Sequence, residues 1–322
     1  MLRLQTPVTD ERCRTGISYN DRIMMLGSCF TENIGIQLRN FGFEVCINPF
    51  GTLYNPASIL NSVERMLDRR PFGIQDCIRI GAGDTRFCSF SHHTSFARGT
   101  EEEFISSANA ALEKAADDFR RCTKVIITLG TSWCFRHMEK DMIVSNCLKR
   151  PAGEFRRERL SVQETADALE RIITLCRERS LSDPDFAPKE FIFTVSPIRH
   201  FKDGAHGNQI SKATLLLGIE EVLSRMDKEN VLSRMDTSED GTAKGCADYF
   251  PAYEIVMDEL RDYRFYAEDM CHPSSQAVDY IRERFLSWAL PEDEHDRLEE
   301  NIRLFRHSQH RQTASASPVS SK

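Results

Sequence analysis

The hydrophobic and polar positions along the chain form two kinds of segment that alternate. Short runs of apolar and β-branched residues end in a turn signal, and a longer stretch with apolar residues at helical spacing follows each run. The runs Val125–Leu129 and Phe191–Val195 are almost continuously apolar, as expected for strands that helices cover on both faces. The alternation predicts an α/β fold with helices around a parallel sheet.

The same pattern places the individual elements. Strands are expected at Arg22–Leu26, Phe43–Ile47, Lys124–Leu129, Glu190–Val195 and Tyr263–Tyr266. Helices are expected at Thr31–Asn40, Pro56–Asp68, Glu101–Arg121, Ser161–Arg179, Gln209–Met226 and Ser274–Leu290. Residues 76–98 and 146–159 are expected to be long loops or small ribbons across the strand ends, where open α/β sheets bind their ligands.

Two segments stand outside this alternation. Val222–Asp227 is repeated almost at once as Val231–Asp236, and because a solenoid needs at least three repeats, we expect an insertion that lengthens a helix or its following loop. Residues 307–322 are rich in Ser, Ala, Gln and Thr, and we expect them to be a disordered tail. The organisation predicted is one domain over residues 1–306, followed by that tail.

Composition narrows the class of protein. With 322 residues, of which 40% are hydrophobic, the chain has enough apolar material for a large core. The 49 acidic residues outnumber the 42 basic ones, which argues against a nucleic-acid or anionic-lipid partner. No apolar run reaches the roughly 20 residues of a membrane span, and the first residues lack a signal-peptide pattern, so we expect a cytoplasmic location without a membrane partner. The 11 cysteines include no CxxC pair and are expected to be reduced.

The first candidate for chemistry is the turn Gly27-Ser28-Cys29-Phe30, which ends the first predicted strand. Small residues let the backbone turn sharply, and the free N–H groups of the following helix meet any side chain at that point. For Cys29 this environment favours the thiolate and predicts a pKa below the ordinary value of roughly 8.5. The alternative is that Ser28 only caps the helix beside a buried cysteine.

A second candidate is Asp269-Met-Cys-His272, which follows the last predicted strand. An Asp three residues before a His can place its carboxylate against Nδ1 of the imidazole, so that Nε2 is free to take a proton. Pro273 stiffens the turn. Carboxylates near histidines are frequent on protein surfaces, but the end of a strand is where such sheets hold their ligands.

Two further turns follow the second and third predicted strands and supply candidate oxyanion donors. The first contains Asn48 and Gly51, and the second runs through Gly130, Thr131 and Ser132. Each puts a glycine N–H and small polar neighbours at the same sheet edge as the first turn, which is what an oxyanion hole requires. Taken one at a time, these glycines are more often simple turn residues.

Other polar residues give weaker signals. Arg199 and His200 end the fourth predicted strand, where Arg199 either holds an anionic group or forms a structural salt bridge. His93 is a candidate pocket residue, but neither it nor His92 has metal ligands at the required spacing. The segment Gly81-Ala-Gly83 lacks the third glycine and the helix of a dinucleotide fingerprint. No cofactor and no metal are therefore expected.

The motifs taken together resemble a known family. They are Gly27-Ser-Cys-Phe-Thr31, Asn48-Pro-Phe-Gly-Thr-Leu-Tyr-Asn-Pro56, Leu129-Gly-Thr-Ser-Trp133, Val195-Ser-Pro-Ile-Arg-His200, Asn208-Gln-Ile-Ser-Lys-Ala213, Tyr249-Phe-Pro-Ala-Tyr-Glu-Ile255 and Asp269-Met-Cys-His-Pro-Ser274. Their order resembles the bacterial GSCFA family, within the SGNH or GDSL-like hydrolase superfamily, with Thr31 where the name has Ala.

The resemblance implies a three-layer α/β/α sandwich with a five-stranded parallel sheet, similar to flavodoxin, with a nucleophile in the first block and Asp269 and His272 as carboxylate and base. Aligned without a gap to the superfamily's Gly-Asp-Ser block, Cys29 takes the nucleophile position, whereas a shift of one residue nominates Ser28. We favour Cys29. The superfamily's third-block Asn is absent, because Thr131, Ser132 and Trp133 stand there.

The function expected from this is that of an esterase, a hydrolase or acyltransferase that acts on a small-molecule or carbohydrate ester, such as an O-acyl sugar. In that reaction Cys29 attacks the ester carbonyl and His272 serves as base and then as acid. The alternative is a member of the superfamily that binds its ligand with little or no turnover, because the altered third block has cost it catalysis.

Overall fold

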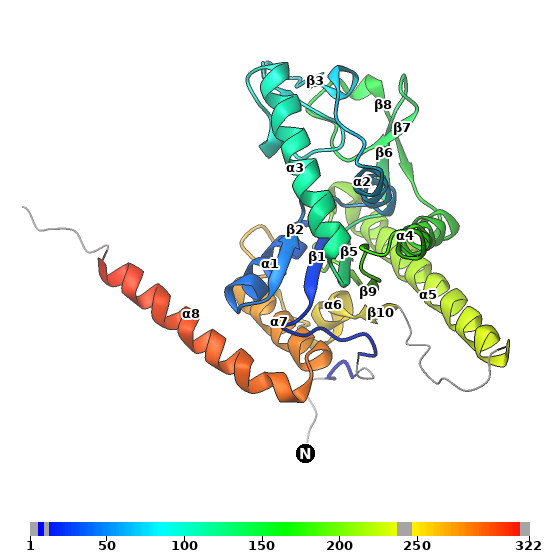
Figure 1. Ribbon diagram of the computed structural model, residues 1–322. Coiled ribbons are helices and arrows are strands. Elements are labelled where there is room, and N and C mark those ends of the chain that lie inside the picture. The colour runs from blue at the N-terminus through cyan, green and yellow to red at the C-terminus, as the bar shows by residue number, and fades with distance from the viewer. Residues whose placement is uncertain (1–5, 10–12, 237–246, 316–322) are drawn as a thin grey trace, which may run out of the picture.

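The computed structural model describes residues 6–9, 13–236 and 247–315, and its centre is a five-stranded sheet (Figure 1). The strands are β1 (Arg22–Gly27), β2 (Glu44–Ile47), β5 (Lys124–Leu129), β9 (Glu190–Val195) and β10 (Ala247–Phe250). They lie in the order β10-β9-β5-β1-β2, and every neighbouring pair is parallel. The order reverses direction at β1, so a crevice is expected beyond the carboxyl ends of β1 and β5.

Helices cover both faces of this sheet because the strand residues are apolar on both sides. Their bounds are α1 (Cys29–Asn40), α2 (Pro56–Asp68), α3 (Glu101–Arg121), α4 (Val162–Ser182), α5 (Gly204–Asp236), α6 (Ala252–Glu254), α7 (Ser275–Ala289) and α8 (His295–Ser315). Met24 and Ile127 point into the core formed with α2 to α5, whereas Met25 and Ile126 point into the core formed with α1 and α7. The α/β class and the five-stranded parallel sheet are thus confirmed.

Smaller strands follow the carboxyl end of β5. A three-stranded antiparallel sheet has the order β7-β6-β8, from Met142–Val144, Trp133–His137 and Phe155–Arg159. A hairpin pairs β3 (Ile78–Arg79) with β4 (Phe87–Cys88). The two expected loop regions therefore contain small ribbons, and these lie together beyond one end of the main sheet (Figure 1).

The prediction of the fifth strand was wrong. Tyr263–Phe265 is a 3₁₀ helix, and the fifth strand is β10, which we had not predicted. The aromatic residues around Tyr263 imitate a strand, but the Asp262 side chain accepts a hydrogen bond from the Arg264 N–H, and this local bond favours a turn. Tyr266 keeps only one isolated antiparallel bridge, to Pro273.

One helix extends beyond its expected end, and another was not predicted. Helix α5 runs through both copies of the duplicated segment, so the duplication lengthens this helix, and Val222 and Met226 of the first copy are buried. Helix α8 projects from the body of the protein and continues through residues 307–315, where we had expected no structure (Figure 1). Good helix formers in that segment, namely Arg, Gln and Ala, outweigh its polarity. Residues 316–322 lie outside the described residues.

Among the described helices, none combines the length and apolarity needed to cross a bilayer.

The end of β1 is tightly packed against its neighbour β5. Gly27 has φ +149°, and a Cβ placed there would lie 2.3 Å from the Thr128 carbonyl oxygen. We predict that Gly27→Ala lowers the free energy of unfolding by about 2 kcal/mol or more, because it adds both a clash and backbone strain. Chemical denaturation measures the loss.

Gly153 provides the matched control for this substitution. It lies in the short 3₁₀ helix Ala152–Glu154, and a Cβ there would meet no atom within 4 Å. Gly153→Ala is expected to change the stability by less than about 0.5 kcal/mol. Equal denaturation midpoints for the two variants would contradict the close approach of β1 to β5.

Candidate functional site

Ser28 and Cys29 have different roles where β1 turns into α1. Ser28 is the N-cap of α1 and is fully buried, and its Oγ accepts a hydrogen bond from the Phe30 N–H at 3.3 Å. Cys29 is the first helical residue and is only partly buried. The cap therefore uses the hydroxyl, while the thiol is left at the surface of the sheet edge.

The thiol of Cys29 meets the turn that carries the predicted acid–base pair. Cys29 Sγ lies 3.6 Å from His272 Nε2, and His272 Nδ1 lies 2.5 Å from Asp269 Oδ2. The side chains of His272 and Asp269 are about half exposed, at 47% and 50%. The three residues thus form a continuous chain of contacts that is open to solvent.

The turn that carries His272 is fixed by its own backbone. The N–H groups of Cys271 and His272 each donate to Asp269 Oδ1 at 2.9 Å, and the Ala267 N–H donates to the His272 carbonyl oxygen at 2.8 Å. The Arg199 N–H donates to the Cys271 carbonyl oxygen at 3.0 Å, which ties the turn to the loop after β9. The imidazole is therefore held in place from two directions.

The electrostatics of Asp269 and Cys29 differ. Three hydrogen bonds hold the Asp269 carboxylate, first from the backbone N–H groups of His272 and Cys271 and then from the imidazole, and they lower its pKa to about 2. Burial raises the pKa of the Cys29 thiol, and Glu32 raises it further. The N–H groups of Cys29 and Phe30 and the ammonium of Lys212 oppose this rise without cancelling it.

The expectation of a lowered pKa for Cys29 was therefore wrong. The helix N-terminus does act on the sulfur through two N–H groups, but the cost of removing a thiolate from water is larger. In the resting site Cys29 is a thiol that needs a base. His272 is the base within reach.

The loop after β2 lies beside this corner. Asn48, at φ +42°, accepts the Gly27 N–H on its Oδ1 at 2.8 Å, and the Leu53 N–H donates to the Gly27 carbonyl oxygen at 2.8 Å. The Asn48 amide also donates to Glu32 Oε1 at 3.4 Å. Asn48 therefore fixes the turn at Gly27 and holds a carboxylate near the thiol.

The glycine N–H groups that we expected to form an oxyanion hole already have partners. The Gly51 N–H donates to the Asn48 carbonyl oxygen at 2.8 Å, and the N–H groups of Gly130 and Thr131 both donate to the Tyr54 carbonyl oxygen at 2.9 Å. The Ser132 N–H donates to Ser211 Oγ at 2.8 Å. These four donors hold the loops together, and none is free for a substrate in this structure.

The other sequence candidates take up supporting positions. The Arg199 guanidinium donates to the Met270 carbonyl oxygen at 3.3 Å and lies over the rings of Phe201 and Tyr266. It forms no salt bridge with another described residue, and its role toward an anionic ligand stays a prediction. His93 caps the 3₁₀ helix Thr94–Phe96 and packs beside Gly51.

Burial lowers the pKa of His200 to about 4, with Lys212 and His272 adding to the effect. Its Nε2 is buried without a hydrogen-bond partner among the described residues. Tyr54 lies in edge-on contact with this ring. A neutral imidazole thus stands at the inner wall of the site.

One face of α5 contains residues whose role we did not predict. Asn208 Oδ1 accepts the His200 N–H at 2.9 Å, which holds the loop after β9. Ser211 Oγ accepts the Ser132 N–H and lies 3.0 Å from Thr131 Oγ1, which holds the loop after β5. Both side chains are buried.

Lys212 completes this face. Its Nζ donates to the Gly130 carbonyl oxygen at 2.6 Å and to the Ser196 carbonyl oxygen at 2.7 Å, so it joins the same two loops. The signal in the sequence was the spacing i, i+3 and i+4 of three polar residues, which places them on one face of a helix. The motif Asn208-Gln-Ile-Ser-Lys-Ala213 contributed only to the family resemblance, without a predicted role.

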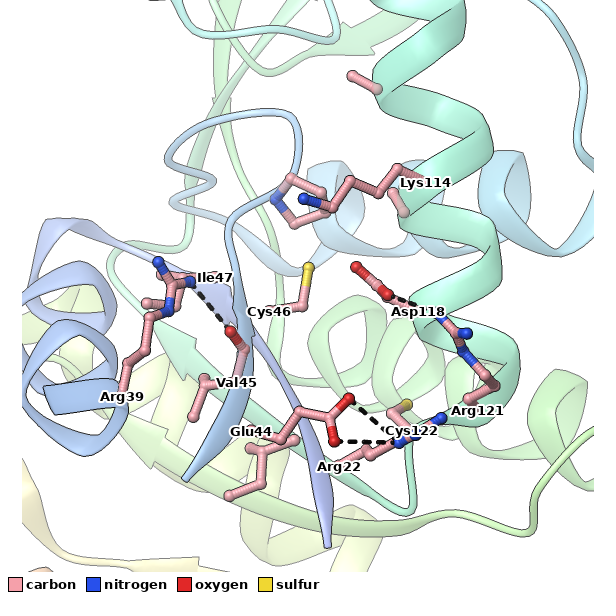
Figure 2. A pocket seen from close by; sticks show the side chains of 14 residues that line it. Arg22, Arg39, Glu44, Val45, Cys46, Ile47, Lys114, Asp118, Arg121 and Cys122 are labelled. Atoms are coloured by element: carbon pink, nitrogen blue, oxygen red, sulfur yellow. Dashed lines mark hydrogen bonds and ion pairs between the residues drawn. The ribbon is translucent and has the colours of Figure 1, made fainter. Parts of the chain in front are cut away.

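A separate cleft of about 450 Å³ runs along β2 and α3 (Figure 2). The Cys46 thiol points into it between Lys114 and Asp118 of α3, and burial raises the pKa of Cys46 to about 12. None of Cys29, His272 or Asp269 lines this cleft. This cleft is therefore separate from the contacts that join Cys29, His272 and Asp269.

The first histidine of the His92-His93 pair belongs to the core. His92 is fully buried among phenylalanine rings, and its Nδ1 lies 2.7 Å from Ser89 Oγ. Burial lowers its pKa to about 3. Within residues 6–9, 13–236 and 247–315, no three His, Cys, Asp or Glu side chains come together as metal ligands would.

Comparison with known proteins adds one informative match. A model of the GSCFA family matches residues 22–285, from β1 into α7, so the match includes both Cys29 and the Asp269–His272 turn. No curated protein matches the chain. A crystal structure of a GDP-L-fucose synthetase from Naegleria fowleri bound to NADP aligns over 94% of this chain and 99% of its own, at 10% identity and a TM-score of 0.25. A TM-score that low supports no argument about function.

The geometry of the turn predicts how Asp269 titrates. Its pKa of about 2 lies below the ordinary value of roughly 3.9, so the turn is stabilised fully above that ordinary value and loses this stabilisation as the pH falls through about 2. Carbon NMR of ¹³C-labelled aspartate, assigned with Asp269→Asn, measures the midpoint. In His272→Ala we expect the pKa to rise but to stay below 3.9, because both backbone donors remain. A parent midpoint near 3.9 would contradict the turn geometry.

Proposed function

The chain belongs to the GSCFA family, and we propose that it is an enzyme that cleaves or transfers the acyl group of an ester, with Cys29 as nucleophile, His272 as base and Asp269 as the orienting carboxylate. One observation supports this above all others. Cys29 and His272 are 243 residues apart in the chain, yet the sulfur lies 3.6 Å from a ring nitrogen whose opposite nitrogen contacts Asp269. Nucleophile, base and orienting group in this sequence of contacts form a catalytic triad.

The proposed reaction has two steps. The Cys29 sulfur bonds to the ester carbonyl carbon while its proton passes to His272 Nε2, and the carbonyl electrons move to the oxygen. When the carbonyl re-forms, the C–O bond to the alcohol breaks, and the alkoxide takes the proton from His272. Water then adds to the thioester with His272 as base, releasing the acid and Cys29. In a transfer reaction an acceptor alcohol replaces the water.

Cys29 is a better candidate for the nucleophile than Ser28. The Ser28 hydroxyl is fully buried and accepts the Phe30 N–H, so its lone pair is used by the helix cap. Asp269 supports the base role of His272, because a carboxylate on Nδ1 fixes the tautomer in which Nε2 accepts a proton.

Developing negative charge on the substrate needs a donor, and the expected loop N–H groups are occupied. The N–H groups of Cys29 and Phe30, in the first turn of α1, lower the pKa of the Cys29 sulfur, and the Phe30 N–H also donates to the Ser28 cap. We propose that this helix end, with its positive dipole, is the anion-stabilising element of the reaction. Membership in the SGNH superfamily, with its flavodoxin-like sheet, is supported by the strand order and by the Asp269–His272 turn.

The substrate class follows from the openness of the site. The side chains of His272 and Asp269 are half exposed, so a substrate reaches them directly from solvent. An O-acyl carbohydrate or another small polar ester fits such a site better than a long-chain lipid does. The occupied loop N–H groups favour one second candidate, a protein that binds such an ester with little or no turnover.

Substitutions at the triad test the proposal. With a panel of p-nitrophenyl and O-acetyl sugar esters, Cys29→Ala and His272→Ala are expected to lower kcat/KM by about 10³-fold or more. Asp269→Asn is expected to lower it by about 10²–10⁴-fold, because the amide favours the wrong tautomer of His272. Ser28→Ala is expected to lose about 1 kcal/mol of stability as a lost helix cap and to keep most of its activity.

Cys147→Ala is the matched control, because it removes another partly buried thiol. It should hydrolyse every ester at the parental rate. If Ser28→Ala alone abolishes turnover, the nucleophile is Ser28. If the parent binds esters by calorimetry but turns none over, the ligand-binding alternative holds.

A further inference from the structure

Arg199 is a cation beside the proposed triad, and within the described residues it pairs with no carboxylate. Its guanidinium makes one hydrogen bond there, from Nη1 to the Met270 carbonyl oxygen at 3.3 Å. Asp269, on the same turn as Met270, contacts the His272 imidazole and two backbone N–H groups instead. An arginine side chain has five N–H donors in a planar fork and is always charged. Most donors of Arg199 therefore have no partner in the described part of the protein and are free for a ligand.

Two aromatic rings hold the guanidinium in place. Its central carbon lies 4.1 Å from the ring centroid of Phe201 and 5.0 Å from that of Tyr266. Stacking of this kind uses the face of a guanidinium and leaves its edge, where the N–H donors lie, for hydrogen bonds. A carboxylate binds at that edge through two parallel N–H···O bonds. Because the rings already restrict the side chain, Arg199 loses little freedom when an anion binds.

The backbone anchors Arg199 to the turn that carries the base. The Arg199 N–H donates to the Cys271 carbonyl oxygen at 3.0 Å, and the guanidinium donates to the carbonyl oxygen of Met270. These two residues immediately precede His272. The Cα atoms of Met270 and His272 are at most about 7 Å apart, because two residues of fully extended chain span no more. A small ligand can therefore contact both the guanidinium and the imidazole.

The surface beside Arg199 suits an organic anion. Phe201, Tyr263 and Met270 are exposed although their side chains are large and apolar. The ring of Tyr263 lies 6.3 Å from that of Tyr266, so the aromatic residues form one group. Apolar surface next to a few well-placed polar donors is typical of sites for small organic ligands. The expected ligand has an apolar or ring-shaped body and one anionic group.

We propose that Arg199 is a specificity-determining residue: its guanidinium binds a carboxylate on the alcohol portion of the ester, so the substrates are esters of hydroxy acids, sugar acids included. The inference rests on the proposed function, because in that reaction His272 returns its proton to the alcohol. The alcohol portion therefore lies on the side of His272, where Arg199 is anchored. No bond to Arg199 forms or breaks in the reaction.

Paired esters that differ in charge test this preference. The 3- and 4-acetoxybenzoates carry a carboxylate on the alcohol portion, whereas the corresponding acetoxybenzamides are neutral and similar in shape. The parent is expected to hydrolyse at least one benzoate with a kcat/KM about tenfold or more above that of its amide. Equal values for both pairs overturn the inference.

Substitutions at Arg199 show whether this residue causes the preference. Arg199→Met removes the charge and is expected to raise KM for the preferred benzoate about tenfold, with kcat and the KM of the amide within about twofold of the parent. Arg199→Lys should keep part of the preference, because it retains a charge but not the planar fork. Comparing each variant with the parent cancels the intrinsic reactivity of the esters. An equal loss for benzoate and amide would mean that Arg199 only holds the turn at Met270, and the inference would be wrong.

Arg297 provides the matched control. It belongs to α8 and also lies over an aromatic ring, 4.3 Å from the centroid of Tyr19. Tyr19 precedes β1, so this stack lies near the amino ends of the strands, away from the triad. Arg297→Met changes the net charge by the same amount and should keep the parental preference for the benzoate. A loss as large as that in Arg199→Met would assign the preference to net charge, against the inference.

Salt provides a test that needs no variant at Arg199, in case Arg199→Met does not fold. A half-exposed ion pair is screened by salt, so KM for the preferred benzoate should rise between low salt and about 0.5 M NaCl. KM for the amide should stay constant. If the two KM values respond to salt alike, the inference is overturned.

Binding without turnover separates this inference from the proposed function. In Cys29→Ala, ligand-observed NMR titration is expected to give a Kd for the benzoate about tenfold or more below that of the amide, and adding Arg199→Met should remove the difference. That result, with a parent that hydrolyses no ester, refutes the proposed function and keeps the anionic ligand. Turnover by the parent with equal affinities keeps the function and overturns the inference. The absence of binding by both esters also overturns it.

Discussion

The turn at Gly27 is the constraint on which the rest of the site depends. β1 lies between β2 and β5, so its last residue must fit against both neighbours, and it does so with a backbone in the region that favours glycine. The Asn48 side chain takes the Gly27 N–H, and the Ser28 N–H donates to the Thr128 carbonyl oxygen at 3.4 Å. A strand end held in this way fixes the axis of α1, and with it the position of the Cys29 sulfur.

The remaining loops of the site are fixed mainly by polar contacts. α5 contributes Asn208, Ser211 and Lys212, and each holds a backbone group just beyond β5 or β9. Buried polar side chains of this kind specify one arrangement, because any shift would leave a buried donor or acceptor unpaired. Ser211 of α5 occupies the Ser132 N–H, and the Tyr54 carbonyl oxygen occupies the N–H groups of Gly130 and Thr131, so none of these three donors is free for a substrate in this structure. These N–H groups instead hold the loops of the site together.

Most of the fold was predictable from the sequence, because the apolar runs are strong. Val125–Leu129 and Phe191–Val195 identify strands that are buried on both faces, and Pro56–Asp68 and Glu101–Arg121 match α2 and α3 residue for residue. The sequence did not predict β10, because four residues that include an Asp give too weak an alternation of apolar and polar positions. The strand forms because it pairs with β9, which is distant in the sequence.

The residues of the candidate site were easier to predict than their energetics. The sequence predicted that Cys29, Asp269 and His272 lie together, since strand ends in a parallel sheet meet at one edge, and the structure has them in contact. The sequence could not show which N–H groups the loops would use internally. It also could not show that the i, i+3, i+4 face of α5 would reach that edge, because this depends on where a helix packs.

The pKa of Cys29 is raised, although the helix N-terminus next to it acts to lower this pKa. The effect of burial must therefore be compared with that of the nearby N–H groups. A helix N-terminus acts over about one turn and favours the thiolate, but burial of the sulfur acts on the whole charge and disfavours it. A thiol whose burial dominates gives up its proton only to a base within reach. His272 Nε2 lies 3.6 Å from the sulfur, and Asp269 contacts the opposite ring nitrogen. The acidity of this cysteine therefore depends on the turn after β1 together with the Asp269–His272 turn, which the fold brings together from 243 residues away in the chain.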